Sequence, residues 1–158
     1  MSRSVVFAVG AVAALALPAS AKPKFTFLGL GVGSPAPTEA VCESLPDGEA
    51  SCQLPKLIHP PLTLVSISLL DGGMYSAGAS FRTADFDAVV SMMRQSYGKP
   101  AKVLRRGTSK DQLQTVIWTF AEGTLSIEQA GDDPNFGWLY FENSSATVEL
   151  SRRRIAPH

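Results

Sequence analysis

One amphipathic stretch near the middle of the chain constrains the fold most, because it carries a helix start, a helix body and a helix stop. Thr83 can cap the helix, Asp85 lies in its first turn, and Gly98 followed by Pro100 ends it. Five apolar residues recur between these signals at helical spacing: Phe86, Val89, Val90, Met93 and Tyr97. A helix with such a stripe needs a partner surface. The stretch therefore predicts one main helix over residues 84–97, packed on a sheet.

Two strand-like runs before this helix predict a hairpin. Residues 62–70 and 74–81 alternate in hydrophobicity and are separated by residues 71–73. A three-residue loop brings the apolar faces of the two runs into register and places Ile67 opposite Ala77. A two-residue loop would place Ile67 opposite a serine or a glycine instead. The sequence therefore favours the three-residue loop.

A second hairpin is predicted after the helix. Residues 113–120 carry apolar side chains on one face, and Glu122-Gly123 has the composition of a two-residue turn. That turn would place Trp118 opposite Ile127, so that the apolar faces agree. The chain therefore supplies at least two antiparallel strand pairs for the sheet.

The only two cysteines, Cys42 and Cys52, predict a disulfide. A redox pair is the alternative, but it normally has the spacing Cys-x-x-Cys, which is absent here. Thr38 can cap a short helix over residues 39–45, which the bridge would tether. The predicted fold class is thus α+β, with an antiparallel sheet packed against one main helix and a short disulfide-tethered N-terminal helix.

The amino terminus predicts export. Residues 1–21 have a charged start, a short apolar core and small residues before the expected cleavage after Ala21, which is typical of a secretory signal peptide. Residues 22–158 are of a length that suits a single domain. We therefore expect a periplasmic or secreted protein without stable membrane insertion after signal cleavage.

The charge balance argues against nucleic acid as a partner. The chain has 14 Lys and Arg residues against 14 Asp and Glu residues, whereas binding to phosphate backbones requires a dense basic face. The basic cluster of residues 152–154 is expected to be a solvated tail. Residues 146–150 before it are compatible with a short helix or with a final strand, and the sequence leaves both open.

The strongest candidate for a binding site is the last predicted strand, because both of its faces are apolar. Trp138 and Tyr140 must point to one side, and Leu139 and Phe141 to the other. Only one of these pairs can lie under the helix. The other pair, together with Phe136, is either covered by another part of the domain or forms a patch that binds an envelope protein.

Enzyme signatures are missing from the sequence. The chain has no nucleophile elbow, phosphate loop or zinc-protease motif, and no cofactor or metal site is predicted. We expect a binding or protein-interaction module. A hydrolytic enzyme with a nonstandard site is the alternative, in which His59 would act with a carboxylate such as Asp71.

Several motifs together resemble known proteins: the run FLGLGVGSPAPTEAVC, the LLDGG turn, the helical segment FDAVVSMMRQSYGKP and the strand VIWTF. They are similar to small exported proteins of proteobacteria. Their order in outline also resembles the small envelope domain of the outer-membrane assembly lipoprotein family and β-lactamase-inhibitor-like domains. The resemblance implies an α+β fold and assigns no site residues, and the chain lacks that lipoprotein family's lipid-attachment cysteine.

Overall fold

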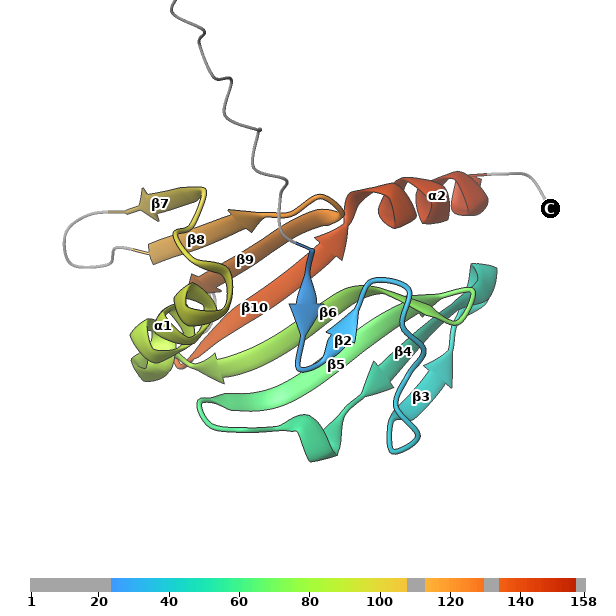
Figure 1. Ribbon diagram of the computed structural model, residues 1–158, viewed down its shortest axis with the longest axis horizontal. Coiled ribbons are helices and arrows are strands. Elements are labelled where there is room, and N and C mark those ends of the chain that lie inside the picture. Colours follow the sequence, from blue (N-terminus) through green and yellow to red (C-terminus); the bar gives the residue numbers. More distant parts are fainter. Residues whose placement is uncertain (1–23, 108–112, 130–133, 156–158) are drawn as a thin grey trace, which may run out of the picture.

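An eight-stranded antiparallel sheet is the main element of the computed structural model, which describes residues 24–107, 113–129 and 134–155. The strand order is β3-β4-β5-β6-β10-β9-β8-β7, with a helix on one face and a second helix beyond the end of β10 (Figure 1). The strands of this sheet are β3 (Val41–Ser44), β4 (Glu49–Gln53), β5 (Leu62–Leu70), β6 (Gly73–Arg82), β7 (Lys102–Arg106), β8 (Leu113–Thr119), β9 (Gly123–Gln129) and β10 (Phe136–Asn143). The remaining elements are β1 (Thr26–Phe27), β2 (Leu30–Gly31), three 3-10 turns, η1 (Pro46–Gly48), η2 (Pro55–Leu57) and η3 (Thr83–Asp85), and the helices α1 (Phe86–Tyr97) and α2 (Ser144–Ile155). The signal-peptide prediction lies outside the described residues.

The predicted main helix is confirmed as α1. Four of the five residues of the predicted stripe are buried, namely Phe86, Val89, Val90 and Met93, and Tyr97 is partly buried. Gly98 ends the helix with a φ of 75°, a conformation that glycine adopts without strain. The predicted Thr83 cap is wrong, because the chain makes the 3-10 turn η3 before α1 begins. The Thr83 hydroxyl is buried without a hydrogen-bond partner among the described residues.

The hairpin of β5 and β6 keeps the predicted pairing in its body but not at its turn. Ile67 pairs with Ala77 as expected, yet the loop has two residues, because Leu70 pairs with Gly73. Asp71 and Gly72 both have positive φ, which gives the twist that a two-residue hairpin turn needs. A bulge next to Ser68 absorbs the extra residue and restores the apolar register.

The turn between β8 and β9 also differs from the prediction. Trp118 pairs with Leu125 rather than Ile127, because Ala121 and Glu122 form the turn and Gly123 begins the strand. The register shift is two residues, so each side chain keeps its face. Gly123 is needed inside the sheet, since a Cβ there would lie 2.0 Å from the Glu142 carbonyl oxygen on β10.

The disulfide between Cys42 and Cys52 is confirmed, but the predicted N-terminal helix is wrong. Residues 41–44 form the strand β3, which pairs with β4 so that the two cysteines lie directly opposite each other. A seven-residue helix gains few internal hydrogen bonds, whereas the ladder to β4 pairs the backbone of this segment. Asp47 and Gly48, both with positive φ, turn the chain between the two strands.

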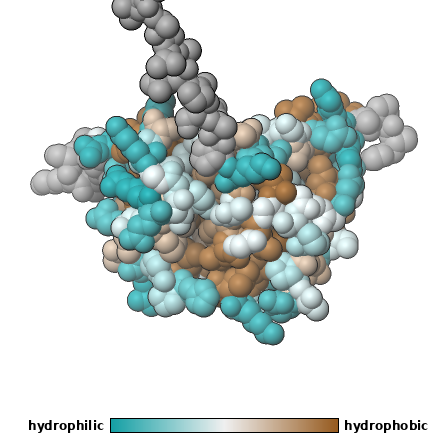
Figure 2. All heavy atoms as spheres, in the orientation of Figure 1, coloured by the Kyte–Doolittle hydropathy of each residue, from teal (hydrophilic) through white to brown (hydrophobic). Residues whose placement is uncertain are grey.

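The core lies between the sheet and a cover made of α1 and the N-terminal hairpin of β1 and β2. Phe25 stacks on Phe141 with 3.6 Å between ring centroids, and Phe120 meets both rings edge-on. The Tyr97 hydroxyl, at the end of α1, donates a hydrogen bond to the Thr26 carbonyl oxygen. Figure 2, seen from this side, shows apolar residues gathered near the middle of the face and mostly hydrophilic residues around them. We call this the core face and the opposite side the outer face.

The C-terminal segment is a helix, α2, which decides between the two alternatives that the sequence leaves open. It begins directly after β10, where the Asn143 side chain accepts a hydrogen bond from the Ala146 amide at 2.9 Å. The expectation of a merely solvated basic tail is wrong for Arg153, which binds both carboxylate oxygens of Asp71 at 2.7 and 2.9 Å. Arg154 binds Glu49 at 2.6 Å. These contacts fix α2 across the ends of β4 and the β5–β6 hairpin.

Candidate functional site

The strand β10 presents its aromatic residues to the outer face in the middle of the sheet. Trp138 is 48% exposed and Tyr140 43%, whereas Leu139 and Phe141 are 1% and 0% exposed in the core. The alternation follows from the two-residue repeat of a strand, and β6 and β9 flank β10 on both sides. The sequence offers residues 136 and 138–141 as candidates for the binding patch. Of these, Trp138 and Tyr140 lie side by side on the outer face.

The strands next to these rings carry short side chains on the same face. Across the sheet, Tyr140 pairs with Gly78, which pairs with Ser66, and the next row holds Ser76 opposite Ser68. The result is a shallow hollow of about 350 Å³. Its outer-face lining consists of Leu64, Ser66, Ser68, Ser76, Gly78, Glu128, Trp138 and Tyr140. We call it the serine trough: two rings form one wall, and serines and a glycine form the floor.

Phe136 extends the aromatic row but borders a different hollow. It is 39% exposed and lies with Arg82, Thr83 and Asn135 around a space of about 450 Å³ at the start of β10. The structure thus does not bring Phe136 into the serine trough, although the sequence groups it with Trp138.

A cluster of hydroxyls and carboxylates lies next to the trough at the end near α2. The Tyr75 hydroxyl donates a 2.5 Å hydrogen bond to Glu49, whose other oxygen accepts from Arg154. Burial, followed by this contact with Glu49, raises the pKa of Tyr75 well above its usual value. Burial likewise raises the pKa of Tyr140. Both hydroxyls therefore remain protonated and can donate hydrogen bonds near neutral pH.

The second helix contributes to the same end of the trough. Thr147 of α2 donates a 2.6 Å hydrogen bond to Glu142, which follows Tyr140 on the outer face of β10. With the Arg154–Glu49 pair, this contact places the start and the end of α2 at the rim of the outer face. The sequence gives no signal for the Arg154–Glu49 pair, because the two residues are 105 positions apart in the chain.

The floor of the trough is the part of the site that sequence reasoning missed. The small residues of β6 belong to both faces of the sheet. Ala77 and Ala79 are buried on the core face, whereas Ser76 and Gly78 face outward. The available signal was the repeat of small residues at every second position of both runs, at Ser66 and Ser68 and again at Ser76 and Gly78.

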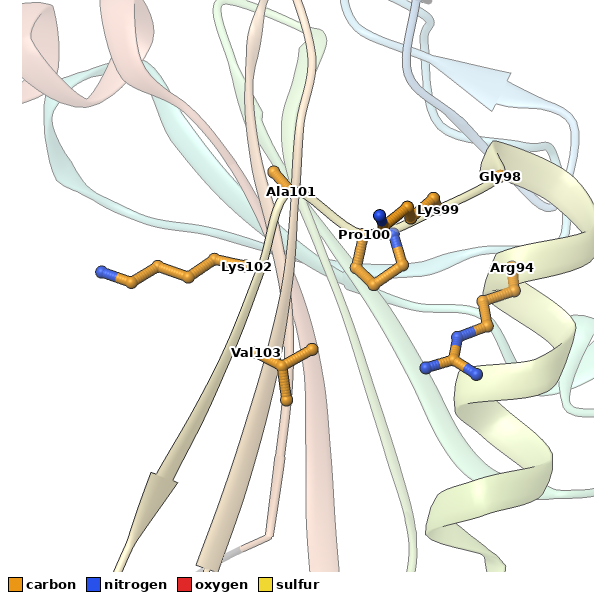
Figure 3. A pocket seen from close by; sticks show the side chains of 7 residues that line it. All are labelled: Arg94, Gly98, Lys99, Pro100, Ala101, Lys102 and Val103. Atoms are coloured by element: carbon orange, nitrogen blue, oxygen red, sulfur yellow. The ribbon is translucent and has the colours of Figure 1, made fainter.

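A third hollow, of about 680 Å³, lies between the end of α1 and the edge strand β7. Figure 3 shows Arg94 reaching from the helix toward the strands, while Lys102 points away on the other side of β7. Cations near a helix C-terminus offset the negative end of its dipole, and charged residues on an edge strand discourage pairing with other chains. These roles account for Arg94, Lys99 and Lys102 without a ligand.

The two residues of the catalytic alternative, His59 and Asp71, do not lie close together. His59 is exposed just before β5, and Asp71 follows the far end of that strand, so roughly 30 Å of extended chain separates them. Asp71 is instead paired with Arg153. In the described part of the chain, no group of three or more His, Cys, Asp or Glu residues is placed to hold a metal ion. The neighbouring acidic residues Asp132 and Asp133 lie outside that part.

No helix among the described residues is long and apolar enough to cross a membrane. The disulfide is compatible with an extracellular or periplasmic protein, since such bonds persist in oxidising compartments. Comparison of the chain with protein-family models, curated proteins and solved structures found no match.

Proposed function

We propose that the protein is an exported binding module, periplasmic or secreted, that holds its ligand or partner on the outer face of the sheet. The observation that carries the proposal is the half-exposed pair Trp138 and Tyr140 in the centre of that face, beside a floor of short side chains. Large aromatic side chains are more often packed in a core or an interface than left in water. The export signals in the sequence and the disulfide support the location.

The surroundings of the pair favour a recognition surface over incidental exposure. Neighbouring strands could cover the rings with longer side chains, but the residues across from Tyr140 are Gly78 and Ser66. The rings therefore stand above the floor beside them and can be covered by another molecule. Aromatic residues in such positions dominate the energetics of many binding sites.

Affinity capture from an envelope extract tests the proposal. The variant Trp138→Ser with Tyr140→Ser removes the wall of the trough, while Val41→Ser with Val148→Ser removes apolar side chains that are 66% and 52% exposed elsewhere. We expect the first variant to lose the proteins and polysaccharides that the wild-type protein retains, because the rings supply most of the contact area. The second variant should retain them.

Thermal unfolding of both variants accompanies the capture. Nearly unchanged midpoints are expected, since substitutions at exposed positions usually change stability little. If the variant at residues 138 and 140 retains the same molecules as the wild-type protein, the outer face is not the binding surface and the proposal is wrong.

A further inference from the structure

We propose that the serine trough binds an uncharged, hydroxyl-rich ligand, a neutral oligosaccharide. This inference rests on the proposed function and names the ligand class of the same site. It follows from three properties of the trough: its backbone is fully used by the sheet, its walls and floor combine rings with hydroxyls, and its carboxylates disfavour anions.

The first property concerns the backbone below the trough. The trough lies over β5, β6 and β10, and each of these strands is hydrogen-bonded to a neighbouring strand on both sides. An extended peptide gains most of its affinity for a sheet by adding to an unpaired edge. These three strands offer no such edge. A ligand here must instead be held by side chains, which favours a molecule whose own polar groups project from a ring.

The second property is the combination of aromatic rings and hydroxyls. A sugar ring has an apolar face of C–H bonds and a rim of hydroxyls. Trp138 and Tyr140 supply flat apolar surfaces for the face, and the half-buried Ser66 and Ser68 supply hydroxyls that both donate and accept hydrogen bonds. Gly78 keeps the floor low because it has no side chain. The space above it is open, since a Cβ there would meet nothing closer than the Ser66 hydroxyl oxygen at 3.4 Å.

The third property is the charge of the lining. Among the described residues, Glu128 is the only charged one that lines the trough. Glu49 and Glu142 lie close to Tyr140 at the end near α2, where Arg154 offsets the charge of Glu49. A phosphate or carboxylate in the trough would meet net negative charge. Carboxylates accept hydrogen bonds from sugar hydroxyls, so the same residues fit a neutral oligosaccharide.

The shape of the trough allows more than one sugar unit. Residues two apart on a strand are separated by about 6.6 Å, which sets the spacing of the two rings along β10. At the end near α2, Tyr140 of the lining lies next to the hydrogen-bonded Tyr75–Glu49 pair. A linear chain therefore lies along the strands, with one terminus against this cluster.

The two tryptophans provide a selective probe. Trp138 lies in the trough, whereas Trp118 is 3% exposed in the core and donates a hydrogen bond to the Gly98 carbonyl oxygen. In the variant Trp118→Phe, the remaining tryptophan emission reports on the trough alone. Cello-, malto- and chito-oligosaccharides of equal length are the neutral probes, and an oligogalacturonate of that length is the charged comparison.

We expect at least one neutral probe to shift the Trp138 emission to shorter wavelength and to protect it from iodide quenching. The oligogalacturonate should bind at least about tenfold more weakly, because its carboxylates meet Glu128 and Glu49. Calorimetry on the wild-type protein should give the same order of affinities, with the neutral probe binding more tightly than the oligogalacturonate. The variants Trp138→Ala and Gly78→Val should abolish binding, the first by removing a ring and the second by filling the floor, while Val148→Ser leaves it unchanged.

Three results would each overturn the inference. One is the absence of any emission change with all three neutral probes at millimolar concentration. The others are equal or tighter binding of the oligogalacturonate, and binding that survives Trp138→Ala. Protein capture that depends on Trp138 and Tyr140, in the absence of saccharide binding, would leave the proposed function intact and assign the face to a protein partner. If the wild-type protein dimerises with rising concentration and the variant Trp138→Ser with Tyr140→Ser does not, the outer face would be assigned to a second copy of the chain.

Discussion

The two faces of β10 carry similar aromatic residues in different surroundings. On the core face, Phe141 is fully buried and stacked on Phe25 from the N-terminal segment. On the outer face, Tyr140 is next to it in sequence and nearly half exposed, with serines and a glycine beside it. The difference lies in what covers each face rather than in the strand itself. One face is therefore expected to determine stability, while the other can change with little effect on the fold.

The largest effect is expected from removing the core ring. Phe141→Ala should lower the free energy of unfolding by about 3 to 5 kcal/mol, because it leaves a cavity under the Phe25 ring. Tyr140→Ala, on the other face of the same strand, should cost no more than about 1 kcal/mol. Urea unfolding with both variants measures the contrast directly. Equal losses would show that the outer rings are part of the structural core.

The sequence predicted the elements whose signals are local and strong. The apolar stripe and the Gly98 stop identify α1, and the alternation around Ile67 places it opposite Ala77. The alternation on β10 also showed that only one pair of its aromatic and aliphatic residues could lie under the helix. Periodicity thus predicted which residues share a face.

The sequence could not predict what depends on distant partners. Residues 41–44 have weak intrinsic preferences, and pairing with β4 decides that they form a strand. Gly123 resembles a turn residue until the close carbonyl oxygen on β10 is known. The cover over Phe141 comes from Phe25, more than a hundred residues away. Which face of β10 stays open was therefore not predictable from the strand alone.

An intermediate effect is expected from glycines on the strands that flank β10. A Cβ at Gly123 would lie 2.0 Å from the Glu142 carbonyl oxygen, so Gly123→Ala must move β9 away from β10. We expect a loss of about 1 to 3 kcal/mol. Gly78→Ala is the matched control, since its Cβ meets nothing closer than 3.4 Å. Its stability should stay within about 0.5 kcal/mol of the wild type, as measured by urea unfolding. A larger loss at Gly78 would show that the floor of the trough cannot accept side chains.

The smallest effect is expected where charge rather than packing joins α2 to the sheet. The two hydrogen bonds from Arg153 hold the pKa of Asp71 below its usual value, so this pair stabilises the native state above the usual pKa of about 3.9. That contribution is lost as the pH falls through the lowered native pKa.

Asp71→Asn should therefore unfold at a lower urea concentration than the wild type at neutral pH, and the difference should shrink as the pH falls below the usual pKa of an aspartate and then through the lowered native pKa of Asp71. Glu43→Gln is the control, because Glu43 is exposed and makes no ion pair among the described residues. It should show no such trend. Amide exchange locates the effect: in acid, α2 should lose protection before β9 and β10, because apolar contacts hold the core face and do not titrate. A simultaneous loss in all three would mean that α2 and the core face unfold as one unit.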